Sequence, residues 1–195
     1  MAIRVGIAGP SGSGKSHLAS ALRRALPGSI LLAADDYYFD LAHLPMEERE
    51  RTDFDHPDAI DHALLARHLT ELGAGRAVDA PVYDFSTHTR SGTRRVEAGD
   101  PVLVEGLFLM CWPDVVAQLD LTVYVDAPVE TCLARRMERD VAQRGRTEEF
   151  VRSQWEQTVL PSRTRHIEPG RANADLVVDG TAPVGQAVDA VRSRL

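Results

Sequence analysis

The residues with the clearest chemical signature form a glycine-rich segment near the N-terminus. The stretch Gly9-Pro-Ser-Gly-Ser-Gly-Lys-Ser16 fits the pattern Gly-x-x-x-x-Gly-Lys-[Ser/Thr]. Its glycines let backbone N–H groups turn toward phosphate oxygens, and the helix that follows adds the positive end of its dipole. Lys15 can reach the β- and γ-phosphates, and the Ser16 hydroxyl can bind Mg²⁺. The predicted nucleotide-phosphate site comprises Gly9, Ser11, Gly12, Ser13, Gly14, Lys15 and Ser16.

Lysine is almost absent from the chain, which makes its position informative. Of the 22 lysine and arginine residues, 21 are arginine and only Lys15 is lysine. Codon bias explains the shift toward arginine, but the remaining lysine lies where a compact ammonium group is needed rather than a planar guanidinium. The chain cannot form the Asn-Lys-x-Asp motif of GTPases, and it lacks the Leu-Ser-Gly-Gly-Gln signature of transporter ATPases. A small-molecule kinase is the class that remains at this length.

Two carboxylates follow predicted buried strands. Asp35 comes directly after the apolar run 29–33, and Glu105 ends the run Val-Leu-Val. Because ligands bind at the carboxyl edge of such sheets, both side chains are expected at the site. We predict Asp35 as the general base toward an acceptor hydroxyl, with Asp36 as its adjacent rival. Mg²⁺ would be held by Ser16, Asp35 and Glu105, directly or through water.

Arginines gather in one predicted helix and the turn that follows it. Arg136 and Arg139 are three residues apart and share a helix face, while Arg144 and Arg146 flank a glycine. A solvated helix face is the simpler interpretation. Next to a phosphate-binding loop, however, such a cluster indicates a lid that clamps phosphates and excludes water. We predict a lid over about residues 136–150, in which the first two arginines are catalytic and the last two bind phosphate.

The elements that must position these residues alternate along the chain. Strands are predicted over 4–8, 29–33, 102–106, 121–125 and 175–178, with a small β excursion over 81–85 and 93–97. Helices are predicted over 15–26, 41–51, 58–72, 128–144, 148–160 and from 183 onward. This alternation indicates a mostly parallel sheet covered by helices on both faces. The expected fold is an α/β P-loop NTPase three-layer sandwich with an arginine-rich lid.

Composition limits the other classes of protein. The chain has 195 residues, 44% of them apolar and 26% charged, which suits one globular domain over residues 1–195. Its net charge of −7 argues against nucleic-acid binding. No long apolar run or signal-peptide pattern occurs, so a soluble, cytoplasmic protein without a membrane partner is expected. Cys111 and Cys132 are expected to be free thiols.

With these motifs assembled, the sequence resembles the uridine kinase (uridine–cytidine kinase) family of P-loop kinases, which is related to phosphoribulokinase. The matches extend from residue 3 to about residue 178. The most specific are Phe-Asp-His-Pro-Asp-Ala at 54–59 and Tyr-Asp-Phe-x-x-His-x-Arg at 83–90. The resemblance implies an ATP- and Mg²⁺-dependent kinase that phosphorylates the 5′-hydroxyl of a pyrimidine nucleoside.

The resemblance also implies a role for each matching position. Asp35 would accept the proton of the ribose 5′-hydroxyl, and Asp55 would hold the ribose hydroxyls together with Arg139. The side chains of Tyr83, Phe85 and His88 would surround the pyrimidine, with His88 facing its exocyclic group. The implied substrate-binding residues are Asp55, Tyr83, Phe85, His88, Arg139 and Gln154.

Alternatives stay open at this point. The acceptor could be another small alcohol, such as ribulose phosphate, pantothenate or nicotinamide riboside, or the chain could be a catalytically silent nucleotide-binding regulator. The last strand runs into Asp179-Gly180-Thr181, where the family continues into a Pro-Arg-Gly stretch, so the adenine contacts stay open. The sequence does not rank uridine against cytidine or ATP against GTP. A homo-oligomer is compatible with the resemblance, but the sequence assigns no oligomeric state.

Overall fold

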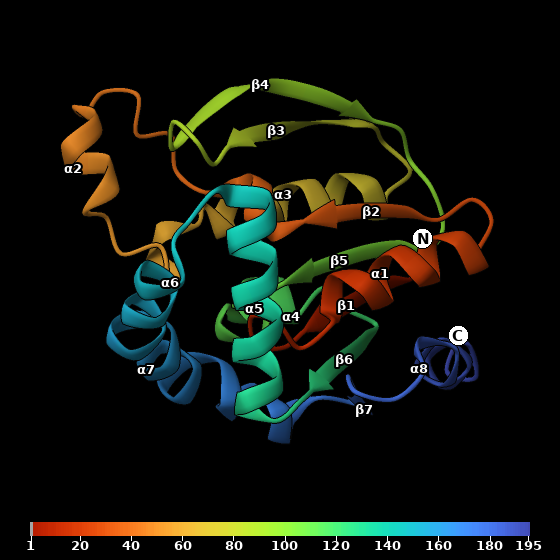
Figure 1. Ribbon diagram of the computed structural model, residues 1–195. Helices are drawn as coiled ribbons and strands as arrows, with labels where there is room; N and C mark the ends of the chain where they lie inside the picture. The colour runs from red at the N-terminus through yellow and green to blue at the C-terminus, as the bar shows by residue number, and fades with distance from the viewer. Residues whose placement is uncertain (1) are drawn as a thin grey trace.

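The computed structural model describes residues 2–195, in which a five-stranded parallel sheet forms the centre (Figure 1). The strand order is β2-β5-β1-β6-β7, and every neighbouring pair is parallel. The strands are β1 (Arg4–Ala8), β2 (Ile30–Ala33), β5 (Val102–Gly106), β6 (Leu121–Asp126) and β7 (Leu176–Asp179). The parallel sheet predicted from the alternating elements is therefore confirmed.

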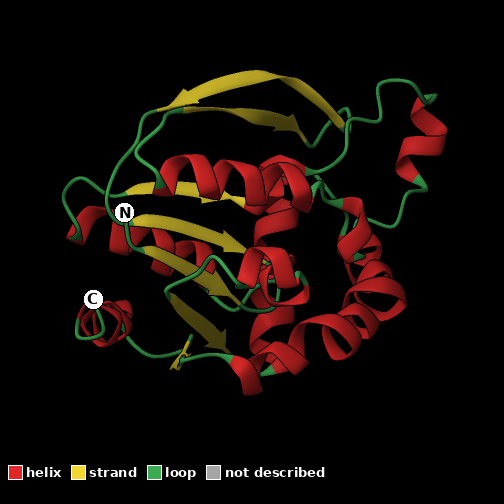
Figure 2. Ribbon diagram, turned by 180° about the vertical axis from the view of Figure 1, so that it is seen from behind, coloured by secondary structure: helices red, strands yellow, loops and turns green. Residues whose placement is uncertain are grey.

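Helices cover both faces of this sheet because its inner strands are apolar on both sides (Figure 2). On one face, α1 (Lys15–Ala25) and α8 (Val184–Arg192) pack against Leu103 and its neighbours. On the other face, α3 (His62–Gly73) and α4 (Pro113–Val116) pack against Val102 and Val104. The alternation along β5 thus divides the core into two apolar clusters, one on each side.

The predicted β excursion is an antiparallel hairpin that lies apart from the main sheet, over α3 (Figure 1). Its strands are β3 (Val78–Asp84) and β4 (Thr89–Val96), which begin three and four residues before the predicted ranges and end one residue short of them. The extension follows from packing, because Val78, Ala80 and Val96 are buried against the α3 side of the core. The hairpin therefore forms a wall above the carboxyl end of β2.

The carboxyl ends of the strands point toward α5 (Val129–Arg144) and the helical segment that follows it (Figure 1). That segment runs through α6 (Glu148–Gln154), a π-helical stretch, α7 (Leu160–Ser162) and a second π-helical stretch to residue 167. The predicted end at residue 160 is therefore too early. Pro161 removes one N–H donor from the helix, and the wider turns on either side keep the chain helical.

Two predicted helices are shorter in the structure. The helix predicted over 41–51 is reduced to α2 (Met46–Glu50), since it buries no side chain and has no apolar face to hold it. The helix predicted from residue 58 begins at His62, because the Asp61 carboxylate accepts a hydrogen bond from the Leu64 N–H and caps the first turn.

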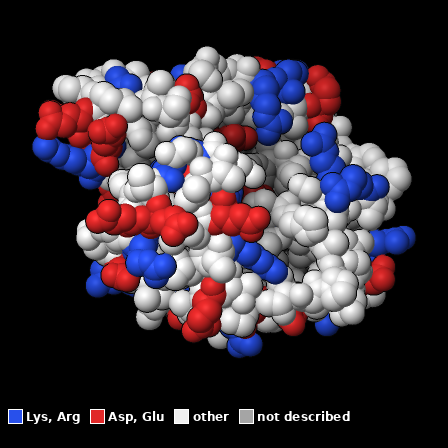
Figure 3. All heavy atoms as spheres, in the orientation of Figure 1, with Lys and Arg blue, Asp and Glu red and all other residues white. Residues whose placement is uncertain are grey.

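The surface is mixed in charge. In Figure 3, acidic and basic side chains are interspersed over the visible face, and α2 at the left carries both signs. Among residues 2–195, no helix is both long and apolar enough to span a membrane. Both cysteines are free thiols, and Cys132 of α5 is buried in a small apolar cluster with Trp155 and Val159.

Candidate active site

The glycine-rich loop joins β1 to α1 and lies against α5. Gly12 has a φ of 82° and its backbone touches the carbonyl of Cys132, so a side chain at this position would collide with the α5 backbone. Ser11, Ser13 and Lys15 are buried in this loop and at the start of α1. The predicted phosphate-binding segment thus has the strand–loop–helix setting that its chemistry requires.

Glu105 connects the loop to the centre of the sheet. Its Oε1 accepts a hydrogen bond from the Ser16 hydroxyl at 3.0 Å, and its Oε2 lies 4.0 Å from the Lys15 Nζ. Oε2 is buried and has no hydrogen-bond partner among the described residues. Burial raises the pKa of Glu105, Lys15 opposes that shift, and the charge of Asp35 adds to it. The site therefore holds a carboxylate oxygen that lacks a hydrogen-bond partner and favours a cation beside it.

Asp35 and Asp36 follow β2 in a 3₁₀ turn (Ala34–Tyr37) but face different parts of the molecule. Asp35 lines a cavity together with Lys15, and within residues 2–195 its buried Oδ1 has no hydrogen-bond partner. Asp36 instead accepts a hydrogen bond from Arg94 of the hairpin at 3.4 Å. Burial raises the pKa of Asp36, and Arg94 partly offsets the rise. Of the two carboxylates, Asp35 is the one that the fold aims at the phosphate loop.

The same cavity collects most of the residues predicted for the acceptor and the lid. The predicted residues that line it are Ser11, Lys15, Asp35, Asp55, Tyr83, Phe85, His88, Arg136, Arg139, Arg144, Arg146 and Gln154. Tyr38, Phe54 and Leu107 complete the wall and were not predicted as site residues. Phe54 begins the 54–59 motif and Tyr38 follows the Asp35-Asp36 pair, so both lay within quoted segments without an assigned role.

Aromatic rings form one end of this cavity. The rings of Phe54 and His88 are stacked, with centroids 4.6 Å apart and planes 16° from parallel. The ring centroids of Tyr38 and Tyr83 are 5.4 Å apart, and the Phe85 ring packs edge-on against the Tyr83 ring. Burial raises the pKa of Tyr83 to about 12, and its buried hydroxyl lacks a hydrogen-bond partner in the described part of the chain. Burial, followed by the charge of Arg146, lowers the pKa of His88. A flat apolar ring with polar edges fits such an environment.

Asp55 provides a polar group between the aromatic end and the lid. Its Oδ2 accepts hydrogen bonds from the Thr158 hydroxyl at 2.6 Å and from the Gln154 amide at 3.5 Å. The Gln154 Oε1 in turn accepts from Arg136 at 2.9 Å and Arg146 at 3.1 Å. Burial raises the pKa of Asp55, while Thr158 lowers it. Thr158 was missed because it lies in a π-helical turn whose facing side no sequence pattern reveals.

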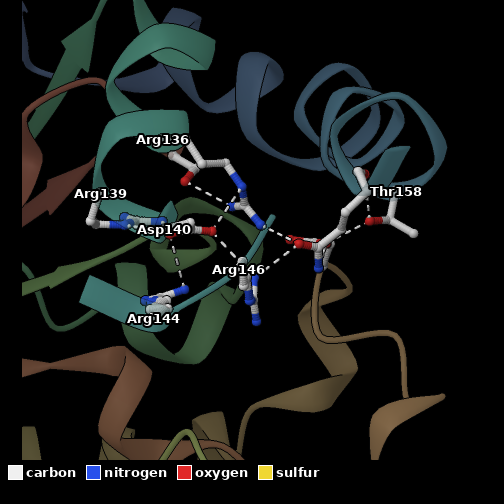
Figure 4. A network of polar contacts seen from close by, with 9 residues as sticks. Arg136, Arg139, Asp140, Arg144, Arg146 and Thr158 are labelled. Carbon is white, nitrogen blue, oxygen red and sulfur yellow. Dashed lines mark hydrogen bonds and ion pairs between the residues drawn. The ribbon is translucent and has the colours of Figure 1, made fainter. Parts of the chain in front are cut away.

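The four predicted lid arginines meet at one carboxylate, that of Asp140 (Figure 4). Arg139 donates to Oδ1 at 2.8 Å and Arg146 donates to Oδ2 at 3.2 Å. Arg136 and Arg144 each lie 3.6 Å from the carboxylate. Arg136 also donates to the hydroxyl of Ser11 in the phosphate loop at 3.0 Å. The predicted lid segment is therefore joined to the phosphate loop by the hydrogen bond from Arg136 to Ser11.

A second cavity, of about 350 Å³, lies on the other side of the phosphate loop. It is mainly apolar and is bounded by α1, β7 and the start of α8. Arg135 Nη1 closes one side, donating to the carbonyls of Ser13 at 3.2 Å and Gly180 at 2.9 Å. Gly180 packs directly on the Ser13 carbonyl, which leaves no room for a larger residue. The stretch that departs from the family pattern thus still shapes a pocket beside the loop.

Comparison with known proteins agrees with this geometry. Residues 4–185 match the Phosphoribulokinase / Uridine kinase family. The uridine kinase of Erwinia tasmaniensis is 40% identical over 98% of this chain and 93% of its own length. That of Shewanella amazonensis is 41% identical with the same coverage.

Solved structures give the same fold. A possible uridine kinase from Bacillus stearothermophilus superposes with a TM-score of 0.58 at 25% identity, over 91% of this chain and 89% of its own. The D-glycerate 3-kinase of Cryptococcus neoformans gives 0.67 at 17% identity, over 93% of this chain and 87% of its own, which bears on the fold alone. The chain belongs to the phosphoribulokinase/uridine kinase family of P-loop kinases.

Proposed function

We propose that this protein transfers the γ-phosphoryl group of ATP to the 5′-hydroxyl of uridine or cytidine. The observation that carries the proposal is one cavity whose lining includes both Lys15 and Asp35 and the stacked pair Phe54–His88. The uridine kinases of Erwinia and Shewanella, which match over nearly the whole chain, support the same acceptor.

Asp35 carries the acceptor chemistry in this proposal. Its unpartnered oxygen is free to accept a hydrogen bond from the 5′-hydroxyl, which orients that oxygen toward the γ-phosphorus. Phosphoryl transfer proceeds through a loose transition state, so the proton moves late and orientation contributes most of the effect. Asp35 then takes the proton as the new P–O bond forms.

Mg²⁺ fits the donor set beside the phosphate loop. Three hard oxygen ligands of the kind this ion prefers meet there: Ser16 Oγ, the Asp35 carboxylate, and the Glu105 Oε2 that has no hydrogen-bond partner among the described residues. When bound there with ATP, Mg²⁺ neutralises charge on the β- and γ-phosphates. The protein's own cations, Lys15 and the lid arginines, hold the remaining phosphate oxygens.

The acceptor is recognised by stacking and by polar edges. Phe54 and His88 offer a flat wall for the base, while the Tyr83 hydroxyl and the His88 ring can hydrogen-bond its exocyclic group. Asp55 is placed to accept hydrogen bonds from ribose hydroxyls. A base-free alcohol such as ribulose phosphate would leave the aromatic wall without a partner. On the donor side, the apolar cavity beside Gly180 suits the adenine ring.

A product assay tests the proposal. The purified protein is incubated with ATP, Mg²⁺ and a panel of uridine, cytidine, adenosine, pantothenate and nicotinamide riboside, and products are identified by mass spectrometry. Formation of uridine and cytidine 5′-monophosphates is expected. Phosphorylation of a non-pyrimidine acceptor in preference to both would overturn the assignment of the acceptor.

A further inference from the structure

Asp140 is a buried carboxylate that has no part in the proposed transfer reaction. It lies in the last turns of α5 with no exposed surface. Its own backbone carbonyl accepts hydrogen bonds from Gly145 and Arg146, so the side chain is fixed where the helix ends. A buried carboxylate is costly unless it is paired, and this one is paired with four guanidinium groups.

Four guanidinium groups share the Asp140 carboxylate through direct ion pairs, and further compensation comes from more distant carboxylates, Asp55 at Arg136 and Arg146 and Asp35 at Arg144. The same four arginines line the cavity that contains Lys15 and Asp35. Asp140 therefore holds the four arginines together beside this cavity, and Arg136 reaches from the cluster to the Ser11 hydroxyl of the phosphate loop.

Burial alone would raise the pKa of Asp140, but the guanidinium groups, led by Arg139, outweigh it and the pKa is lowered. The carboxylate is thus ionised in the ligand-free protein. Glu138, two residues earlier on the same helix, is exposed and forms no ion pair in the part of the chain that the structure describes. The arrangement belongs to Asp140 and not to acidic residues of α5 in general.

We propose that Asp140 is a positioning residue, which gathers the four lid arginines and holds them at the phosphate cavity before ATP binds. The inference rests on the proposed function in that it takes ATP as the phosphoryl donor. Unrestrained arginine side chains have many rotamers, and ordering them when ATP binds would cost conformational entropy and so weaken binding of ATP and of the transition state. Asp140 performs that ordering during folding instead.

The first test compares Asp140→Asn with Glu138→Gln, since each removes one negative charge and nearly preserves shape. We expect Asp140→Asn to lower kcat/KM for ATP by about 10²-fold, divided between weaker ATP binding and a lower kcat, because the arginines lose their alignment. Glu138→Gln is expected to stay within about threefold of wild type. Asp140→Asn activity within that same range, or failure of this variant to fold, would overturn the positioning role.

The second test separates positioning by charge from simple filling of space. Asp140→Ala leaves a small hole that formate, an anion, and formamide, a neutral molecule of similar size, can both enter. Formate is expected to restore at least tenfold of the lost activity, and formamide is expected to restore none. Equal rescue by both additives would assign Asp140 a packing role and overturn the proposal, and so would the absence of any rescue in the folded variant.

Binding of a non-hydrolysable ATP analogue, measured by calorimetry, separates this inference from the proposed acceptor. If wild type phosphorylates neither uridine nor cytidine, the proposed function fails. The positioning role is then still decided by whether Asp140→Asn weakens analogue binding by about tenfold or more while Glu138→Gln does not.

Discussion

Replacing Asp35 by Asn, beside the matched replacement of Asp36, separates the reaction chemistry from the fold at a single turn. The two carboxylates are adjacent in sequence, and both variants lose one negative charge with little change in shape. Asp35 faces the cavity with an oxygen that is unpartnered within the described chain, whereas Asp36 pairs with Arg94 of the hairpin. The two changes should therefore act on different properties of the protein.

The expected magnitudes follow from these contacts. Asp35→Asn breaks no hydrogen bond of the buried Oδ1, and it removes a negative charge that disfavours the ionised form of Glu105. The free energy of unfolding should therefore change by less than about 0.5 kcal/mol, and any change should be an increase. Asp36→Asn loses a half-exposed ion pair, worth about 0.2–1 kcal/mol. For kcat, loss of a general base costs about 10²- to 10⁴-fold, and the lower end applies where the carboxylate mainly orients the hydroxyl. Asp36→Asn should retain kcat within about threefold.

The assay couples ADP release to NADH oxidation and is run on both variants at low and high Mg²⁺, with thermal unfolding measured in parallel. If Asp35 also ligates Mg²⁺, part of its loss recovers at the higher concentration. The reasoning is refuted if Asp36→Asn is the more damaging change. It is also refuted if Asp35→Asn keeps kcat near that of wild type while remaining folded.

Three further outcomes are expected. His88→Asn should raise KM for the nucleoside about tenfold or more and leave KM for ATP unchanged. Asn is chosen because it tolerates the left-handed backbone that His88 has at a φ of 55°. Equal effects on both KM values would show that His88 is not part of the acceptor site. Because burial lowers the pKa of His88, its ring is neutral at about pH 7.5. Acidification to about pH 5.5 should lower kcat/KM for cytidine relative to uridine, because a protonated imidazole can only donate hydrogen bonds. An unchanged ratio of the two kcat/KM values would contradict this. The methyl group of Gly180→Ala should press on the Ser13 carbonyl and reduce kcat/KM for ATP about tenfold or more. The control, Gly185→Ala, places its methyl group in open space and should be neutral or stabilise α8 by up to about 1 kcal/mol. Similar kinetics for the two variants would contradict the contact between Gly180 and Ser13.

Local sequence patterns predicted the parts of the fold that depend on local chemistry. The phosphate loop is contiguous, so its glycines, Lys15 and Ser16 could be located before any tertiary arrangement was known. Asp35 and Glu105 follow apolar runs, and parallel strands necessarily bring their carboxyl ends to one edge of the sheet. Short apolar runs likewise predicted the strands of the sheet to within one residue at each end.

Long-range packing produced what the sequence did not reveal. Asp140 has no sequence motif that marks it, because its burial among four arginines depends on how α5 meets the segment after Gly145. Thr158 reaches Asp55 across about a hundred residues of chain, through a π-helical turn that no periodicity indicates. Phe54 stacks on His88 only because the hairpin turn folds back over it.

The most direct test of the account is the acceptor competition between uridine and a base-free alcohol. Uridine and ribulose 5-phosphate are offered together at equal concentration with ATP and Mg²⁺, and the initial rates of both products are measured by mass spectrometry. The aromatic end formed by Phe54, Tyr83 and His88 predicts that uridine 5′-monophosphate forms almost exclusively. Preferential phosphorylation of the sugar phosphate would contradict it.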